Sequence, residues 1–164
     1  MVEFTSGKEY QLVVFKLNDE EFGVPITQVR EINRLAKPTK IPKSPSFVEG
    51  VINLRGQIIP IIDLKKRFDL ELGEYTSEAR IIVVEVQEQV FGVIVDAVSE
   101  VLRISGQEIE KTPAMATAID AQYIAGVGKV GERLLIILDI DKLLTAEEHA
   151  ALQEMQVEGE VTAQ

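Results

Sequence analysis

Short apolar runs alternate with turn residues along most of the chain. The runs are rich in Val, Ile and Leu, and Gly, Pro or pairs such as Asn18-Asp19 separate them. Runs of this kind are typical of strands joined by tight turns. One segment, "GVINLRGQIIPIIDL" from Gly50 to Leu64, differs because the charged Arg55 lies between two apolar runs, directly before Gly56. The pattern therefore predicts a mainly β protein with an arginine at the tip of one turn.

The apolar pattern occurs twice. Leu12–Ile32 aligns without a gap with Ile81–Val101 at an offset of 69, and Glu49–Phe68 aligns with Ala125–Leu144 at an offset of 76. Each copy contains about five strand signals. Five short strands with little helix favour a small barrel, which closes on itself and leaves no exposed edge. The repeat therefore predicts two fused five-stranded barrels.

Barrels of about 60 to 70 residues have marginal cores of their own. We therefore expect the two to pack tightly against each other, with a groove between them. The expected organisation is one domain over 1–164, with subdomains at about 12–70 and 79–144 and a C-terminal helix at about 145–156. Terminal elements are free to exchange between the barrels in this arrangement.

Helical signals are few. The segment 64–68 has the apolar spacing of a short helix. In "TAEEHAALQEMQ", Thr145 and Glu148 have the spacing of a capping box, and Leu152 and Met155 form a short apolar stripe. We expect this second helix to dock on a barrel and the residues after it to fray.

Charge and composition narrow the possible partners. The chain has 164 residues, a net charge of −10 and no cysteine. Negative charge repels nucleic acid phosphates and anionic lipids, and without cysteine there is no disulfide framework or thiolate metal site. No segment approaches the roughly 18 apolar residues that span a bilayer, and the first residues lack the pattern of an export signal. We expect a cytoplasmic protein that binds no nucleic acid and does not insert into the membrane.

Three features resemble reactive or ligand-binding sites but fit structural roles better. "GVGKVG", Gly126 to Gly131, matches a dinucleotide-binding pattern, yet an apolar run follows it instead of a helix, so a hairpin is predicted. His149, the only histidine, is expected to be exposed on the polar side of its helix. Asp139 and Asp141 share a strand face and fit capping better than catalysis. We predict no catalytic residue, no metal site and no cofactor.

Arg55 is the residue that the predicted fold explains least. The second copy has Gly131 at the matching position, so the barrel itself does not require an arginine. A guanidinium group suits carboxylates and amides and keeps its charge when it is partly desolvated. Two interpretations stay open: a recognition residue at an interface, or a clamp to an acid such as Glu31. One arginine can serve both.

Four segments together resemble the CheW family of bacterial chemotaxis coupling proteins. They are "FGVPITQVREI", "FVEGVINLRGQIIPIIDL", "FGVIVDAVSEVLRI" and "YIAGVGKVGERLLIILDIDKLL", and the similarity extends from about Gln11 to the C-terminal helix. "EGVINLRG" followed by "IIPIIDL" is highly specific to CheW-like domains. The resemblance implies two SH3-like five-stranded barrels packed together, with a hydrophobic groove between them.

The resemblance also implies a non-enzymatic adaptor without cofactors. In the family, such proteins bridge the cytoplasmic helical hairpins of chemoreceptors (methyl-accepting chemotaxis proteins) to the CheW-like regulatory domain of the histidine kinase CheA, in arrays beneath the receptors. By this resemblance, the receptor-binding groove consists of Val13, Ile26, Val29, Glu31, Ile32, Val51, Arg55 and Val98. Ile41 and Phe47, in "TKIPKSPSF", are the candidate kinase-binding residues.

Two alternatives remain beside the adaptor. The first is a CheW-like domain of another chemosensory protein, although 164 residues leave no room for a receiver or ATP-binding domain as well. The second is a small-ligand-binding β-barrel protein. It needs a polar pocket with perturbed titratable groups, whereas the expected groove is apolar with one Arg-Glu pair.

Overall fold

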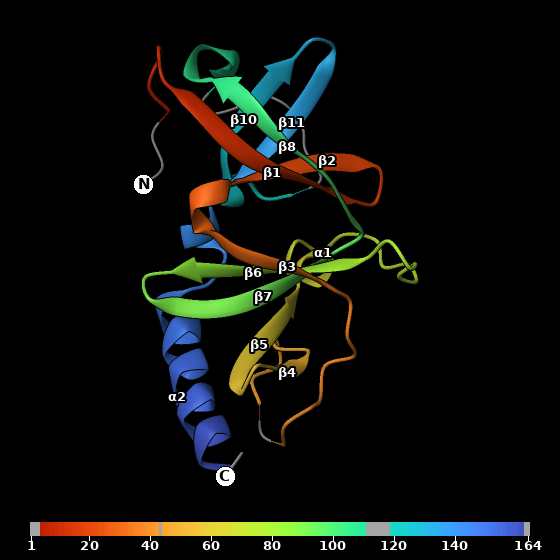
Figure 1. Cartoon of the computed structure of the whole chain (residues 1–164), viewed down its shortest axis with the longest axis vertical. Coiled ribbons are helices and arrows are strands. Elements are labelled where there is room, and N and C mark those ends of the chain that lie inside the picture. The colour runs from red at the N-terminus through yellow and green to blue at the C-terminus, as the bar shows by residue number, and fades with distance from the viewer. Residues whose placement is uncertain (1–3, 43, 111–118, 163–164) are drawn as a thin grey trace.

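Two curled β-sheets lie one above the other in the computed structural model (Figure 1). The structure describes residues 4–42, 44–110 and 119–162, with side chains of the last helix described up to Glu154. Within these residues, no helix is long and apolar enough to cross a membrane. The prediction of a mainly β fold built from two packed barrel-like units is confirmed.

The upper sheet has six strands among the described residues, in the order β8-β1-β2-β11-β10-β9. They are β1 (Glu9–Leu17), β2 (Glu20–Pro25), β8 (Ala97–Ser105), β9 (Ile109–Glu110), β10 (Ile124–Val130) and β11 (Arg133–Leu138). The lower sheet has five described strands, in the order β3-β6-β7-β5-β4. They are β3 (Val29–Arg34), β4 (Gly50–Leu54), β5 (Gln57–Asp63), β6 (Arg80–Val86) and β7 (Gln89–Val95). Short 3-10 helices lie between strands or after them: η1 (Ile26–Gln28), η2 (Gly106–Glu108), η3 (Ala121–Tyr123) and η4 (Ile140–Lys142).

Each sheet combines strands from both copies of the sequence repeat. The β1–β2 hairpin of the first copy pairs antiparallel with β8 and parallel with β11 of the second copy. The β6–β7 hairpin of the second copy pairs in the same way with β3 and β5 of the first. The ranges 12–70 and 79–144 therefore follow the repeat, and both sheets cut across them. Neither sheet can form without both halves of the chain.

The same β-bulge occurs in both sheets. The register between β1 and β8 shifts at Ser99, and that between β3 and β6 shifts at Arg30. These residues are 69 positions apart, which is the offset of the repeat. A bulge bends its strand and redirects the side chains that follow. Here it places Glu31 and Glu100 at equivalent positions on the edge strands β3 and β8.

The central hairpins are buried on both faces. In β1, Val13, Phe15 and Leu17 belong to a core shared by the two sheets, while Leu12 and Val14 pack inside the upper sheet. Strand β6 repeats this division with the residues 69 positions later. A strand with apolar side chains on both faces must be covered on both. The two units therefore pack tightly, as expected.

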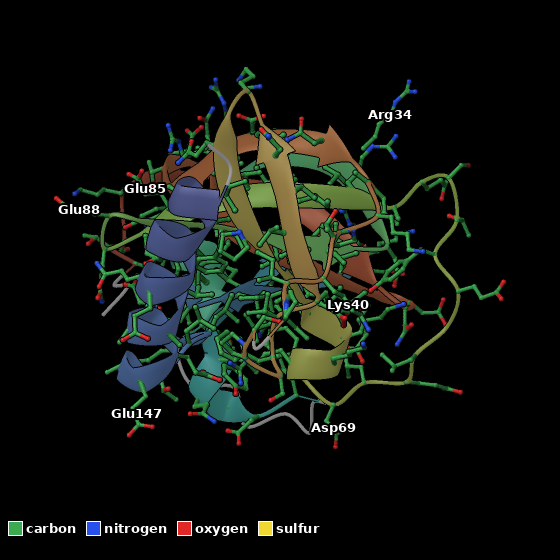
Figure 2. The ribbon with its side chains drawn as sticks, turned by 90° about the horizontal axis from the view of Figure 1, so that it is seen from below. Arg34, Lys40, Asp69, Glu85, Glu88 and Glu147 are labelled. Carbon is green, nitrogen blue, oxygen red and sulfur yellow. The ribbon has the colours of Figure 1, made fainter. Side chains whose placement is uncertain are left out.

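Helix α2 (Ala146–Thr162) packs on the lower sheet, beside β5 and β7 (Figure 2). The predicted capping box is present: Thr145 Oγ1 accepts a hydrogen bond from the Glu148 amide (3.1 Å), and Glu148 Oε1 accepts one from the Thr145 amide (2.9 Å). Leu152 is fully buried, while the side chain of Met155 lies outside those described. The helix continues past the expected end at 156, since one glycine weakens a helix by about 1 kcal/mol without ending it.

A buried lysine links the two sheets. Lys65 lies in the one-turn helix α1 (Leu64–Arg67), at the end of β5, and its Nζ is 2.8 Å from Asp96 Oδ1. Asp96 lies where the chain crosses from β7 to β8, and its Oδ2 accepts a hydrogen bond from the Asn18 amide of the β1–β2 turn (2.6 Å). The interaction joins the lower sheet to the upper one, and the sequence pattern did not predict it.

Candidate interaction surface

Arg55 occupies the tip of the β4–β5 hairpin. Its φ of 52° and the φ of 87° at Gly56 are both positive, as in two-residue turns of type I′. Asn53 Oδ1 accepts a hydrogen bond from the Gly56 amide at 2.8 Å. A residue with a Cβ is disfavoured at such a φ, whereas glycine is not. The Arg55 side chain is 73% exposed. The turn therefore holds an arginine where the backbone alone favours glycine.

Arg55 forms an ion pair with Glu31 on β3, in which Nη2 donates to Oε2. Asn33 Nδ2 donates to the other carboxylate oxygen at 2.9 Å. The hydrogen bonds from Arg55 and then from Asn33 lower the pKa of Glu31, and the bond to Glu31 raises the pKa of Arg55. The clamp to Glu31 is thus present, and it leaves most of the guanidinium open to solvent.

The second copy of the repeat pairs its equivalent acid with a different arginine. Glu100, 69 positions after Glu31, accepts a hydrogen bond from Arg133 Nη2 at 3.0 Å. Arg133 also binds both carboxylate oxygens of Glu21, at 3.2 and 2.7 Å. Gly131 occupies the turn itself, with a φ of 61°. Sequence reasoning missed this pair, although the match between Glu31 and Glu100 was a signal for it.

The apolar residues of the predicted groove divide into a surface set and a buried set. The surface set is Ile26, Val29, Ile32 and Val98; Ile32 is 39% exposed, and the others are partly buried against the shared core. Val13 and Val51 are only 1% and 7% exposed. These two therefore support the surface from the core and present almost no area to a partner. We call the surface set, together with the Arg55–Glu31 pair, the β3–β8 surface.

Ile41 and Phe47 lie in the loop before β4, and both are partly buried against the shared core. The Arg67 guanidinium lies over the Phe47 ring, 5.4 Å from its centroid, and binds Glu148 of α2 at 2.5 Å. The Phe47 end of this loop therefore packs against α1, which the Arg67–Glu148 pair joins to α2.

The glycine-rich "GVGKVG" segment is a hairpin, as predicted, because β10 pairs antiparallel with β11. A Cβ at Gly126 would lie 2.8 Å from Ile109 Cγ2, and one at Gly128 would lie 2.7 Å from Ile104 Cδ1. These glycines therefore allow close packing inside the upper sheet and do not follow a dinucleotide-binding geometry.

Asp139 caps η4, since its Oδ1 accepts a hydrogen bond from the Asp141 amide at 3.2 Å. Burial and the neighbouring Asp141 charge raise the pKa of Asp139.

The expectation of an exposed His149 was wrong: the residue is half-buried and both ring nitrogens are buried. Helix α2 packs along the lower sheet, which covers a position that is polar in the sequence. Among the described residues, no group of three His, Asp or Glu side chains could hold a metal ion.

A family model described as CheW-like domain matches residues 11–148. The chain belongs to the CheW-like family. The chemotaxis protein CheW of Klebsiella aerogenes is 40% identical to it over 146 residues, covering 89% of this chain and 87% of the relative. CheW of Bacillus subtilis is 36% identical over 145 residues, covering 88% and 92%.

A solved CheW structure has the same fold. The scaffolding protein TtCheW from Thermoanaerobacter tengcongensis matches with a TM-score of 0.79 and 41% identity, over 86% of this chain and 97% of that one. The resemblance carried by the four sequence segments is therefore confirmed, and the chain is a member of a chemotaxis scaffold family. Membership of an adaptor family agrees with the prediction that the chain is not an enzyme.

Proposed function

We propose that this chain is a non-enzymatic adaptor that couples chemoreceptor cytoplasmic tips to the histidine kinase CheA and supports kinase activation and array assembly. The similarity to chemotaxis and scaffolding proteins supports this role. The observation that carries the proposal is the exposed Arg55, kept at a positive φ and paired with Glu31 near apolar surface. The corresponding location is the cytoplasm, in membrane-associated arrays held by protein partners.

The β3–β8 surface suits one helix of the receptor hairpin. Apolar contacts with Val29, Ile32 and Val98 supply affinity, and a charged pair fixes the register of a docked helix. A guanidinium has five N–H donors, and the bond to Glu31 uses the Nη2 end of Arg55. The remaining donors are available to a carboxylate or carbonyl oxygen of the receptor.

The kinase-facing surface is assigned to the loop that contains Ile41 and Phe47. The contact of Phe47 with Arg67, which is itself paired with Glu148, supports this choice, because a side chain that is already held in place loses little entropy when it binds. CheA would contact this loop through its own CheW-like domain, while the receptor occupies the β3–β8 surface.

Capture of a receptor cytoplasmic fragment by Arg55→Gly and Val98→Asp tests the receptor assignment. Glycine suits the positive φ of the turn, so Arg55→Gly retains the fold, and we expect capture to weaken about tenfold. Arg103→Ala is the matched control, because Arg103 is also exposed and paired with a glutamate, Glu9, but lies outside this surface. Each variant's melting temperature is measured in parallel.

The outcomes separate the two roles of Arg55. Weaker capture at an unchanged melting temperature supports direct contact, whereas a parallel loss of both assigns the arginine to the clamp alone. Unchanged capture by both variants contradicts the receptor surface. Co-sedimentation with receptor fragment and CheA, scored by kinase activation, tests the coupling itself.

A further inference from the structure

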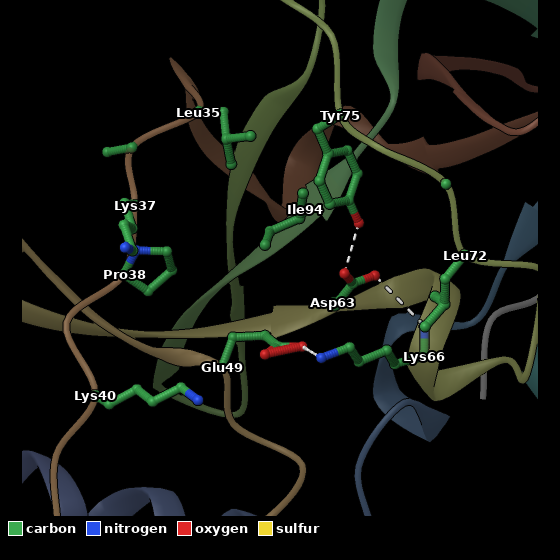
Figure 3. A pocket seen from close by; sticks show the side chains of 12 residues that line it. Leu35, Lys37, Pro38, Lys40, Glu49, Asp63, Lys66, Leu72, Tyr75 and Ile94 are labelled. Atoms are coloured by element: carbon green, nitrogen blue, oxygen red, sulfur yellow. Dashed lines mark hydrogen bonds and ion pairs between the residues drawn. The ribbon is translucent and has the colours of Figure 1, made fainter.

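A cavity of about 620 Å³ lies on the lower unit, and none of its lining residues belongs to the β3–β8 surface (Figure 3). This volume is in the range of small-molecule sites. Its apolar walls include Leu35, Pro38, Leu72 and Ile94. In Figure 3, the segment from Leu35 to Lys40 and the loop from Leu72 to Tyr75 lie on opposite sides. The cavity is therefore bounded by two chain segments, which suits a compact ligand.

Both carboxylates in the cavity are already bound. Asp63 accepts a hydrogen bond from the Tyr75 hydroxyl at 2.6 Å and caps α1 through the amides of Lys65 (2.9 Å) and Lys66 (3.4 Å). Glu49 forms an ion pair with Lys66. Burial, and then the bond to Asp63, raise the pKa of Tyr75, so its hydroxyl remains a donor to Asp63. Both acids therefore already have partners within the protein.

The lysines of the cavity, by contrast, have hydrogen-bond donors to spare. Lys37 and Lys40 line it, and neither forms an ion pair with a carboxylate in the part of the chain that the structure describes. An ammonium group has three donors, and Lys66 uses one toward Glu49. Figure 3 shows the Lys40 side chain extending in the direction of Glu49. Three lysines and two carboxylates line the cavity, so its net charge is positive on a chain with a net charge of −10.

We propose that this cavity binds a small amphipathic carboxylate, an organic acid with a short aliphatic or aromatic body. The body packs against Leu35, Leu72 and Ile94, where burial of apolar surface is favourable. The carboxylate accepts charge-assisted hydrogen bonds from Lys37 and Lys40. The site is separate from the proposed adaptor surface, so such a ligand could be bound together with the receptor.

Titration of the methyl-labelled chain with octanoate tests the proposal by NMR. We expect the Leu35, Leu72 and Ile94 methyl signals to shift in a saturable way. Lys37→Gln/Lys40→Gln should raise the octanoate Kd about tenfold, because it removes both unpaired cations. Lys8→Gln/Lys129→Gln removes the same charge elsewhere and should leave the Kd unchanged. Octylammonium, with the same chain and the opposite charge, should not bind.

Three results would overturn the proposal. Equal binding of octylammonium would show that the lysines do not select the ligand. An equal loss of affinity in both lysine double variants would show that only net charge matters. Shifts of the same methyls by a peptide of alternating Glu and Leu, with none by octanoate, would make the cavity a peptide site instead.

Discussion

Replacing Lys65 with methionine tests whether a buried ion pair holds the two sheets together. The Lys65 side chain is 2% exposed, and methionine fills similar space but leaves Asp96 without its cation. Removing one partner of a buried pair costs about 3–5 kcal/mol. Asp96 keeps the hydrogen bond from the Asn18 amide at 2.6 Å, and its side chain is 22% exposed. We therefore expect the lower end of the range, about 3 kcal/mol.

Urea unfolding followed by circular dichroism measures this loss. The free energy of unfolding falls with urea concentration at about 2 kcal/mol/M, so the urea concentration at the unfolding midpoint should fall by about 1.5 M. Lys65→Met/Asp96→Asn should recover about half of the loss, because no unpaired charge remains. The control is Lys66→Met in the same helix: Lys66 is 55% exposed and pairs with Glu49, so the change should cost about 0–1 kcal/mol.

Two results would refute this reasoning. A loss below about 0.5 kcal/mol for Lys65→Met would show that the pair adds nothing beyond its desolvation cost. A double variant as unstable as the single one would show that lost packing around the lysine stem, and not the uncompensated Asp96 charge, is the cause.

Two further predictions concern a capping acid and a packed glycine. Because burial and the neighbouring Asp141 charge raise the pKa of Asp139 in the folded state, the folded chain holds the carboxyl proton more readily than the unfolded chain does. The contribution of Asp139 to stability is therefore largest at low pH and falls as pH rises past the ordinary pKa of an aspartate. Asp139→Asn keeps an acceptor for the Asp141 amide, so stability at pH 7 should hold or rise, and the loss of stability with rising pH should vanish. Urea unfolding midpoints measured from acidic to neutral pH check this prediction. A variant that is less stable than the unmodified chain at pH 7 contradicts it. Gly92→Ala places a Cβ 2.7 Å from Ile61 Cδ1 and should cost about 1–3 kcal/mol, more than Gly23→Ala, where the nearest atom is 3.2 Å away. Equal melting temperatures for the two alanine variants would show that the lower sheet relaxes freely.

Local patterns predicted the elements of the fold and the arginine of the candidate site. Alternation of apolar residues marked the strands, the spacing of Thr145 and Glu148 marked the helix start, and Gly56 after Arg55 marked a turn with an exposed guanidinium. The pairing of Arg55 with Glu31 was also foreseen, as one of two interpretations. The strands, the helix start and the turn depend on residues close in sequence, which a single sequence displays, whereas the Arg55–Glu31 pair stayed one of two open interpretations until the structure placed the two residues together.

The sequence by itself determined that this protein is two β units with one repeated plan and a distinctive arginine turn. Only the tertiary structure decided which strands share a sheet. The two copies are so alike that a hairpin has the same local signal whether it pairs within its own copy or with the other, and long-range packing of the shared core makes the choice. The same packing covers His149 and Val13, brings Lys65 to Asp96, and selects Arg133 as the partner of Glu100. Such contacts join residues far apart in the chain, and no short-range pattern encodes them.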